Sequence, residues 1–229
     1  MTSEVRRDAL KRGLDLHKSG RLDEALTWYR AAIAIDADDA EANSLLGLAL
    51  VHSGRGEEGL SHLRRAVELE PDQVPFRFNL VQGLQQAGAY PGAIAELGVI
   101  LAREPSNFFG WELAGDIARE QGDNDGAAAA WQRARQADPT ATGPALKLAS
   151  LEIEKSRFDA VLSLLDPIAT AAAANEQIYE LWCRALTGLR DWRALRATAL
   201  SWVGSHPESS AARQNLARAE AELGLRRGS

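Results

Sequence analysis

The chain has 229 residues and a formal net charge of −6, with 26 Lys and Arg against 32 Asp and Glu. This acidic balance argues against nucleic-acid binding, which requires a basic surface. The single cysteine excludes an intramolecular disulfide, and no apolar run approaches the ~20 residues of a membrane-spanning helix. The start, Met1–Arg7, lacks the apolar core of a secretory signal. We therefore expect a cytoplasmic protein with neither a nucleic-acid nor a membrane partner.

Glycine recurs at a fixed interval along the chain. Residues 34 apart occupy one slot, and in chain order they are Gly20, Gly54, Gly88, Gly122, Ser156, Arg190 and Gly224. A period of this length is the signature of a repeat array. No insertion or deletion interrupts the frame, so repeats are expected to start near residues 6, 40, 74, 108, 142 and 176. We predict that residues 1–229 form a single domain of six helix hairpins with a capping helix at 210–224.

Each repeat, taken in chain order, is expected to contain two helices separated by the glycine slot. A glycine there suits the left-handed conformation that ends a helix. Small residues stand at two positions that should face each other across the hairpin, as Gly13 and Ala25 do in the first repeat. Their size lets the two helix backbones approach closely. A hairpin cannot bury its apolar face alone, so the core is predicted to form by stacking neighbouring repeats.

The fourth repeat carries the most complete pattern. It places Trp111, Gly115, Ala127, Trp131 and Pro139 where tetratricopeptide (TPR) repeats place Trp, Gly, Ala, an aromatic residue and Pro. On this pattern the chain is identified as a member of the TPR family, and its alanine- and arginine-rich composition is typical of a bacterial protein. The resemblance implies an all-α, right-handed superhelical solenoid of antiparallel helix hairpins. It also implies protein binding without catalysis.

The fifth and sixth repeats depart from the pattern. Pro167 falls inside the predicted second helix of the fifth repeat, where a proline usually kinks a helix at a cost of about 3 kcal/mol. The small slot on the second helix holds Val161 and Leu195 in these two repeats. We expect a local irregularity in this region.

Catalytic and metal-binding arrangements find little support. His17 and His52 stand near the ends of successive first helices and are expected to approach each other, but no carboxylate stands at ligand spacing beside them. Cys183 occupies a small-residue slot, so it is predicted to be a buried core residue. Most tryptophans also fall in packing positions, Trp202 among them. We predict no enzyme activity, no catalytic residue, no metal and no cofactor.

The family resemblance implies that the first helices line a concave groove. Leu48, Phe78 and Phe109 would place apolar side chains there, and apolar groups in a concave surface indicate a binding site. Three acids spaced four residues apart would share one helix face, where their repulsion invites a cation. The predicted partner-binding residues are Leu48, Phe78, Gln82, Phe109, Glu112, Asp116 and Glu120. The predicted partner is a protein or peptide with an apolar anchor and a nearby Lys or Arg.

Other interpretations remain open. The acidic face could be an ordinary solvated surface. The array could dock a substrate or partner for a larger enzyme of the transferase or oxygenase class, or it could self-associate through its ends. Two recognition patterns of the family, the carboxylate clamp and the asparagine ladder, are absent: the sixth position of the repeats holds only Asn79 and Asn215 as scattered asparagines.

Overall fold

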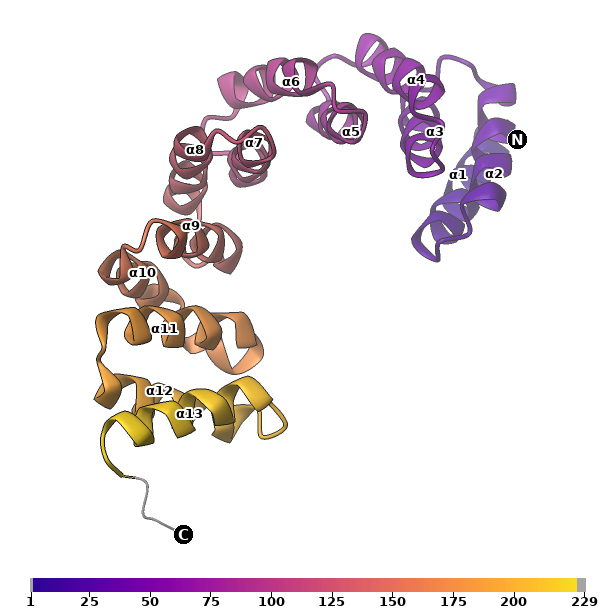
Figure 1. Ribbon diagram of the computed structural model, residues 1–229. Helices are drawn as coiled ribbons and strands as arrows, with labels where there is room; N and C mark the ends of the chain where they lie inside the picture. Colours follow the sequence, from indigo (N-terminus) through magenta and orange to yellow (C-terminus); the bar gives the residue numbers. More distant parts are fainter. Residues whose placement is uncertain (1, 226–229) are drawn as a thin grey trace. The chain divides into compact units, whose positions relative to one another are not determined.

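A computed structural model describes residues 2–225, which fold into 13 α-helices and one 3₁₀ helix, with no strand in that range (Figure 1). The helices are α1 (Thr2–Lys18), α2 (Leu22–Ile35), α3 (Ala40–His52), α4 (Gly56–Leu69), α5 (Val74–Gln86), α6 (Tyr90–Arg103), α7 (Phe108–Glu120), α8 (Asn124–Ala137), α9 (Thr142–Glu154), α10 (Phe158–Leu165), η1 (Asp166–Ala174), α11 (Glu176–Leu189), α12 (Trp192–Ser205) and α13 (Ser210–Glu222). The all-α prediction is therefore confirmed.

The repeat frame also predicts where the helices begin. From the second repeat onward, the first helices begin at Ala40, Val74, Phe108, Thr142, Glu176 and Ser210, which are the predicted starts. Only α1 differs, because it begins at Thr2, ahead of residue 6. The 34-residue frame predicts these helix starts because the turns between helices have nearly constant length.

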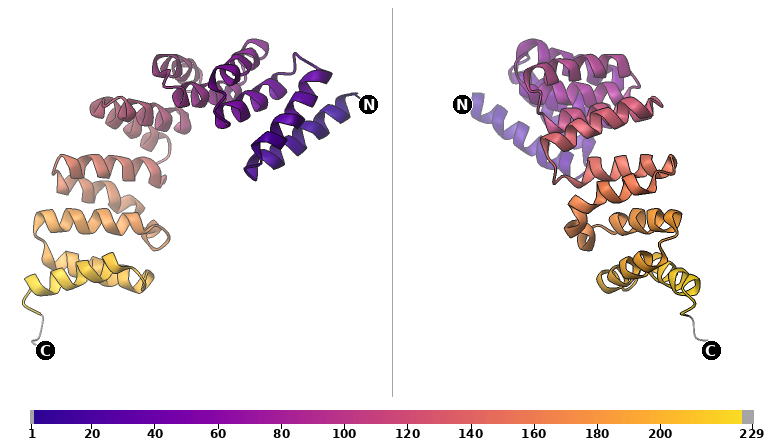
Figure 2. Two further views of the ribbon diagram at one scale, coloured as in Figure 1. Left: turned by 45° about the vertical axis from the view of Figure 1, so that its right-hand side comes forward. Right: turned by 90° about the vertical axis from the view of Figure 1, so that its left-hand side faces the viewer.

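The chain divides into two compact units between Gly110 and Trp111. In both units consecutive helices run antiparallel (Figure 2). The first unit has a core that includes Tyr29 and Leu50, and the second has a core that includes Ile178 and Trp202. The repeat frame runs unbroken through the division, and a single solenoid stays a prediction.

Small residues bring the paired helices into close contact, as the sequence predicts. A Cβ atom added to Gly47 would lie 2.8 Å from the carbonyl oxygen of Gly59, so α3 and α4 touch through their backbones. A Cβ atom on Gly13 would lie 2.5 Å from the ring of Tyr29, which is fully buried. At these positions any side chain larger than hydrogen would push a hairpin apart.

The glycine slot holds a left-handed residue in every repeat. The φ angle is +78° at Gly20, +82° at Gly54 and +67° at Gly224, and it stays positive where glycine is absent. Ser156 has φ of +56° and Arg190 has φ of +57°. The two substitutions therefore leave the turn in place at the cost of backbone strain, since a left-handed L-residue costs roughly 1–2 kcal/mol.

The irregularity at Pro167 differs from the predicted kink. The helix α10 ends at Leu165, and residues Asp166–Ala174 continue as the 3₁₀ helix η1. Proline has no N–H to donate to the carbonyl of the preceding turn, so the α-helical ladder stops there. The large residues at the neighbouring small slots, Val161 and Leu195, are fully buried in the core of the second unit.

Replacing the two strained residues by glycine should stabilise the second unit. We expect Ser156→Gly and Arg190→Gly each to raise the free energy of unfolding by about 1 kcal/mol, because glycine adopts positive φ without a Cβ penalty. Urea unfolding followed by circular dichroism measures the change. Gly122→Ala is the matched reverse substitution and should lower stability by a similar amount. A loss of stability in both glycine variants would contradict this account.

Candidate functional site

The predicted binding residues of the first unit differ widely in exposure. Leu48 and Phe78 are half-buried, so they contribute partly to packing, while Gln82 is exposed. Phe109 is 69% exposed, and its ring meets that of Phe108 edge-on with centroids 5.2 Å apart. Phe109 is therefore the apolar side chain of this set that is most available to a partner.

The acidic residues predicted on α7 already have a cation. The ammonium of Lys147, on α9, donates a hydrogen bond of 2.9 Å to Glu112 and one of 2.7 Å to Asp116. The indole of Trp131 also donates to Asp116, at 3.0 Å. Burial opposes the charge of Lys147, but the hydrogen bonds that its ammonium donates to Asp116 and Glu112 outweigh this effect and raise its pKa. The cation that these two acids were expected to draw from a partner comes from the chain itself.

The seven predicted residues are divided between the two units. Four of them lie in the first unit, from Leu48 to Phe109, and the three acids lie in the second. Glu120 is exposed at the end of α7. Of this set, Gln82, Phe109 and Glu120 are exposed.

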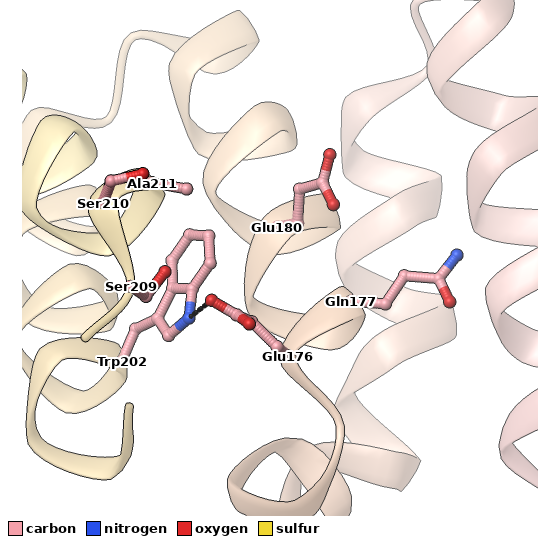
Figure 3. A pocket seen from close by; sticks show the side chains of 7 residues that line it. All are labelled: Glu176, Gln177, Glu180, Trp202, Ser209, Ser210 and Ala211. Atoms are coloured by element: carbon pink, nitrogen blue, oxygen red, sulfur yellow. Dashed lines mark hydrogen bonds between the residues drawn. The ribbon is translucent and has the colours of Figure 1, made fainter. Parts of the chain in front are cut away.

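A cavity of about 510 Å³ opens between α11 and α13 in the second unit (Figure 3). Both helices begin there: the Asn175 side chain caps α11 by accepting from the backbone N–H of Gln177, and Ser209 caps α13 by accepting from Ala212. The cavity is lined by Glu176, Gln177, Glu180, Trp202, Ser209, Ser210 and Ala211.

Two carboxylates give this cavity its charge. Glu176 is fixed, because the indole of the buried Trp202 donates a hydrogen bond of 3.0 Å to its carboxylate, as Figure 3 shows. A hydrogen bond with Ser209 is the main cause that lowers the pKa of Glu176, which keeps it charged. Glu180 stands one turn further along α11, is exposed, and forms no ion pair with any residue from 2 to 225. The lining of this cavity is therefore acidic.

Only part of this site could be predicted from the sequence. Glu176 and Glu180 were not among the predicted partner-binding residues, and the structure places both in the lining of this cavity. Trp202 was predicted to pack in the core, and it does, at 1% exposure. Its hydrogen bond to Glu176 was missed, because the two residues belong to different helices of a repeat and no motif connects them.

His17 and His52 approach each other as predicted. The Nε2 atom of His17 lies 2.9 Å from Nδ1 of His52, and the hydroxyl of Tyr29 lies 3.5 Å from Nδ1 of His17. Burial is the main cause that lowers the pKa of His17, and the nearby His52 lowers it further. The close pair of rings therefore favours a neutral His17.

The prediction that Cys183 is a buried core residue is confirmed. It is 1% exposed and belongs to the core of the second unit. Burial raises the pKa of its thiol to about 12, so the reactive thiolate is not formed near neutral pH. Cys183 thus acts as a small apolar residue.

Antiparallel hairpins that turn at one left-handed residue and pack through small side chains define a helical-repeat scaffold. The family model described as "TPR repeat" matches residues 13–54, and the one described as "Tetratricopeptide repeat" matches residues 78–142. These two stretches of the chain are tetratricopeptide repeats, and such repeats support protein–protein interaction in general.

Solved structures with the same fold are similar at low sequence identity. A Pseudomonas aeruginosa PilF structure is 17% identical with a TM-score of 0.72, covering 95% of this chain and 99% of that one. A tetratricopeptide repeat protein from Parabacteroides merdae is 12% identical with a TM-score of 0.65, covering 97% and 88%. A MamA structure is 16% identical with a TM-score of 0.60, covering 76% and 97%.

No curated protein matches the chain. Among the helices of residues 2–225, none combines the length and apolarity that would carry it across a membrane.

Removing the cation of the α7–α9 cluster should expose the repulsion between its acids. We expect Lys147→Met to lower the free energy of unfolding by about 1 kcal/mol, because two half-buried carboxylates lose a shared charged donor. Adding Glu112→Gln in the same chain should restore part of the loss, since one negative charge is removed. Urea unfolding of both variants tests this, and equal stability of Lys147→Met and the parent chain would contradict it.

Acid should destabilise the first unit through His17. Its folded-state pKa lies below the unfolded value, so the unfolded chain binds more protons and stability is lost as the pH falls below about 6.5. We expect His17→Gln to lose less stability than the parent chain between about pH 7.5 and pH 5.5. Urea unfolding at the two pH values measures the difference. His206→Gln, in the second unit, is the control, and equal pH dependence in the parent and His17→Gln would refute the assignment.

Proposed function

We propose that this chain is a non-catalytic scaffold that holds a peptide segment of a protein partner against the first helices of its repeats. A lysine or arginine of the segment lies between Glu176 and Glu180. The observation that carries the proposal is the cavity of about 510 Å³ between α11 and α13, which these two carboxylates line.

The charge of the cavity supports a cationic group. Glu176 is held by Trp202 and Ser209, so little side-chain freedom is lost when a ligand binds. Glu180 is exposed and has no ion-pair partner among the described residues, so it is available to a new donor. A charged donor shared by two carboxylates makes the stronger kind of hydrogen bond.

The partner's cation is assigned to this pair of acids in place of those on α7. Lys147 already pairs with both Glu112 and Asp116, and a cation of a partner would have to displace it. The acids of α11 need no such exchange. The same partner chemistry predicted from the sequence is therefore kept, at different residues.

Phe109 supports an apolar contact with a partner. Its exposed ring lies on a first helix, and large aromatic side chains dominate the energy of protein interfaces. Its neighbour Phe108 is half-buried and supports the exposed ring from one side. We propose Phe109 as a separate anchor point in the first unit.

Selection of peptides from a random displayed library tests the proposal. We expect sequences selected on the full chain to be enriched in Lys and Arg. Binding of a selected peptide should weaken roughly tenfold or more in Glu180→Lys, because a charge-assisted hydrogen bond is replaced by repulsion. Fluorescence anisotropy of the labelled peptide measures the affinity.

The matched control is Glu57→Lys, which reverses an exposed glutamate on α4, a second helix outside the cavity. This variant should bind the peptide as the parent chain does. If Glu180→Lys and Glu57→Lys weakened peptide binding equally, the change in the net charge of the chain would explain the effect, and the proposed site would be contradicted.

A further inference from the structure

A second cavity, of about 380 Å³, lies further along the same two helices. Arg184 and Thr187 of α11 and Asn215 and Arg218 of α13 line it, over the ring of Phe158. The cavity depends on specific packing, because a Cβ atom on Gly188 would collide with that ring. Its polar wall is basic, in contrast to the cavity at the start of α11.

The two arginines of this cavity lack acidic partners. Arg184 makes no hydrogen bond or ion pair with any residue from 2 to 225, and its side chain is exposed. Arg218 has no ion pair in that range either, but its guanidinium lies over the ring of Trp192, 5.7 Å from the centroid. Other arginines of this acidic chain do have partners, such as Arg77 with Glu96 and Arg119 with Glu154. The second cavity is thus lined by two guanidinium groups that form no ion pair among residues 2–225.

The acidic and basic cavities follow one another on a single face of α11. Glu176, Glu180 and Arg184 are spaced four residues apart, which places them on one side of a helix. With a rise of 1.5 Å per residue, Arg184 lies about 12 Å along the axis from Glu176. On α13, Ser210 and Ala211 line the first cavity and Arg218 lines the second. The two cavities thus follow one another along α11 and α13, the first lined by acids and the second by arginines.

We propose that the second cavity binds an oxyanion, held by the guanidinium groups of Arg184 and Arg218. Planar guanidinium groups match a carboxylate or phosphate with paired hydrogen bonds. The hydroxyl of Thr187 offers a further donor at the same wall. The anion site depends only on these residues.

Taken with the proposed function, on which this step rests, the two cavities specify the ligand further. A segment with a basic side chain at Glu176 and an anionic group at Arg184 spans about 12 Å. An extended chain advances about 3.3 Å per residue, so the two charges are about four residues apart. The ligand is a peptide segment of mixed charge with its basic residue near the start of α11.

Titration of the full chain with simple anions tests the oxyanion site without any peptide. Sodium acetate and inorganic phosphate are the probes, and the arginine Nε–Hε signals are followed by nuclear magnetic resonance. We expect the signals of Arg184 and Arg218 to shift and saturate. Arg193, an exposed arginine of α12 outside the cavity, should shift weakly and without saturation. Shifts at Arg184 no larger than those at Arg193 would overturn the proposal.

The two probes also distinguish the source of the anion. Tighter binding of acetate assigns the site to an acidic residue or a chain terminus of the peptide. Tighter binding of phosphate assigns it to a phosphorylated residue. Either result supports an oxyanion site.

Two labelled peptides then connect the anion site to the proposed function. One has a lysine and a glutamate separated by three alanines, and the other has glutamine in place of the glutamate. We expect the first to bind roughly tenfold more tightly, and Arg184→Gln to abolish this difference. Arg193→Gln is the matched control and should preserve it.

The outcomes separate the two proposals. If both peptides bind equally and acetate does not saturate at Arg184, the oxyanion site is wrong while the proposed function stands. If acetate saturates at Arg184 but neither peptide binds, the oxyanion site stands and the proposed cation site is wrong. Thermal unfolding of Arg184→Gln checks that a lost difference does not come from a lost fold.

Discussion

One residue in each repeat must take a left-handed conformation so that the first helix can end and the second can fold back against it. Gly20, Gly54, Gly88 and Gly122 meet this requirement freely, while Ser156 and Arg190 meet it under strain. The close helix contacts follow from the turn, because Gly47 and Gly59 touch only when the chain reverses at the right residue. The cavities of the second unit lie between helices that these turns position.

The repeat frame predicts the fold because its signals are local and recur. Turn glycines, small slots and first-helix starts each have a fixed place in the repeat, so α3, α5, α7, α9, α11 and α13 begin at the expected residues. Pro167 shows the limit of this reasoning. A proline inside a predicted helix indicates a break, but whether the chain kinks or continues as a 3₁₀ helix depends on its packing against the next repeat.

The site was harder to predict than the fold. The acids of α7 were recognised as a cluster, but their partner Lys147 stands on the first helix of the next repeat, beyond the range of a single helix pattern. The same limit hid the contact between Glu176 and Trp202. Charge along one helix can be read from spacing, whereas its neutralisation depends on which side chains the stacking of repeats brings together.

Several polar contacts between neighbouring first helices share one sequence separation. His17 with His52, Ser44 with Asn79, Glu112 with Lys147 and Arg119 with Glu154 are each 35 residues apart. This separation is one repeat plus one residue, so each contact joins a position to the next position of the following repeat.

Contacts between residues 35 apart depend on the length of a repeat. One inserted residue would move every later partner by about 100° around its helix and 1.5 Å along it, and the polar groups would face the wrong neighbours. These polar contacts between neighbouring first helices thus form only when each repeat keeps its length, and they impose this requirement independently of core packing. This requirement offers a physical reason why the frame of this chain tolerates residue changes in the glycine slot but contains no insertion.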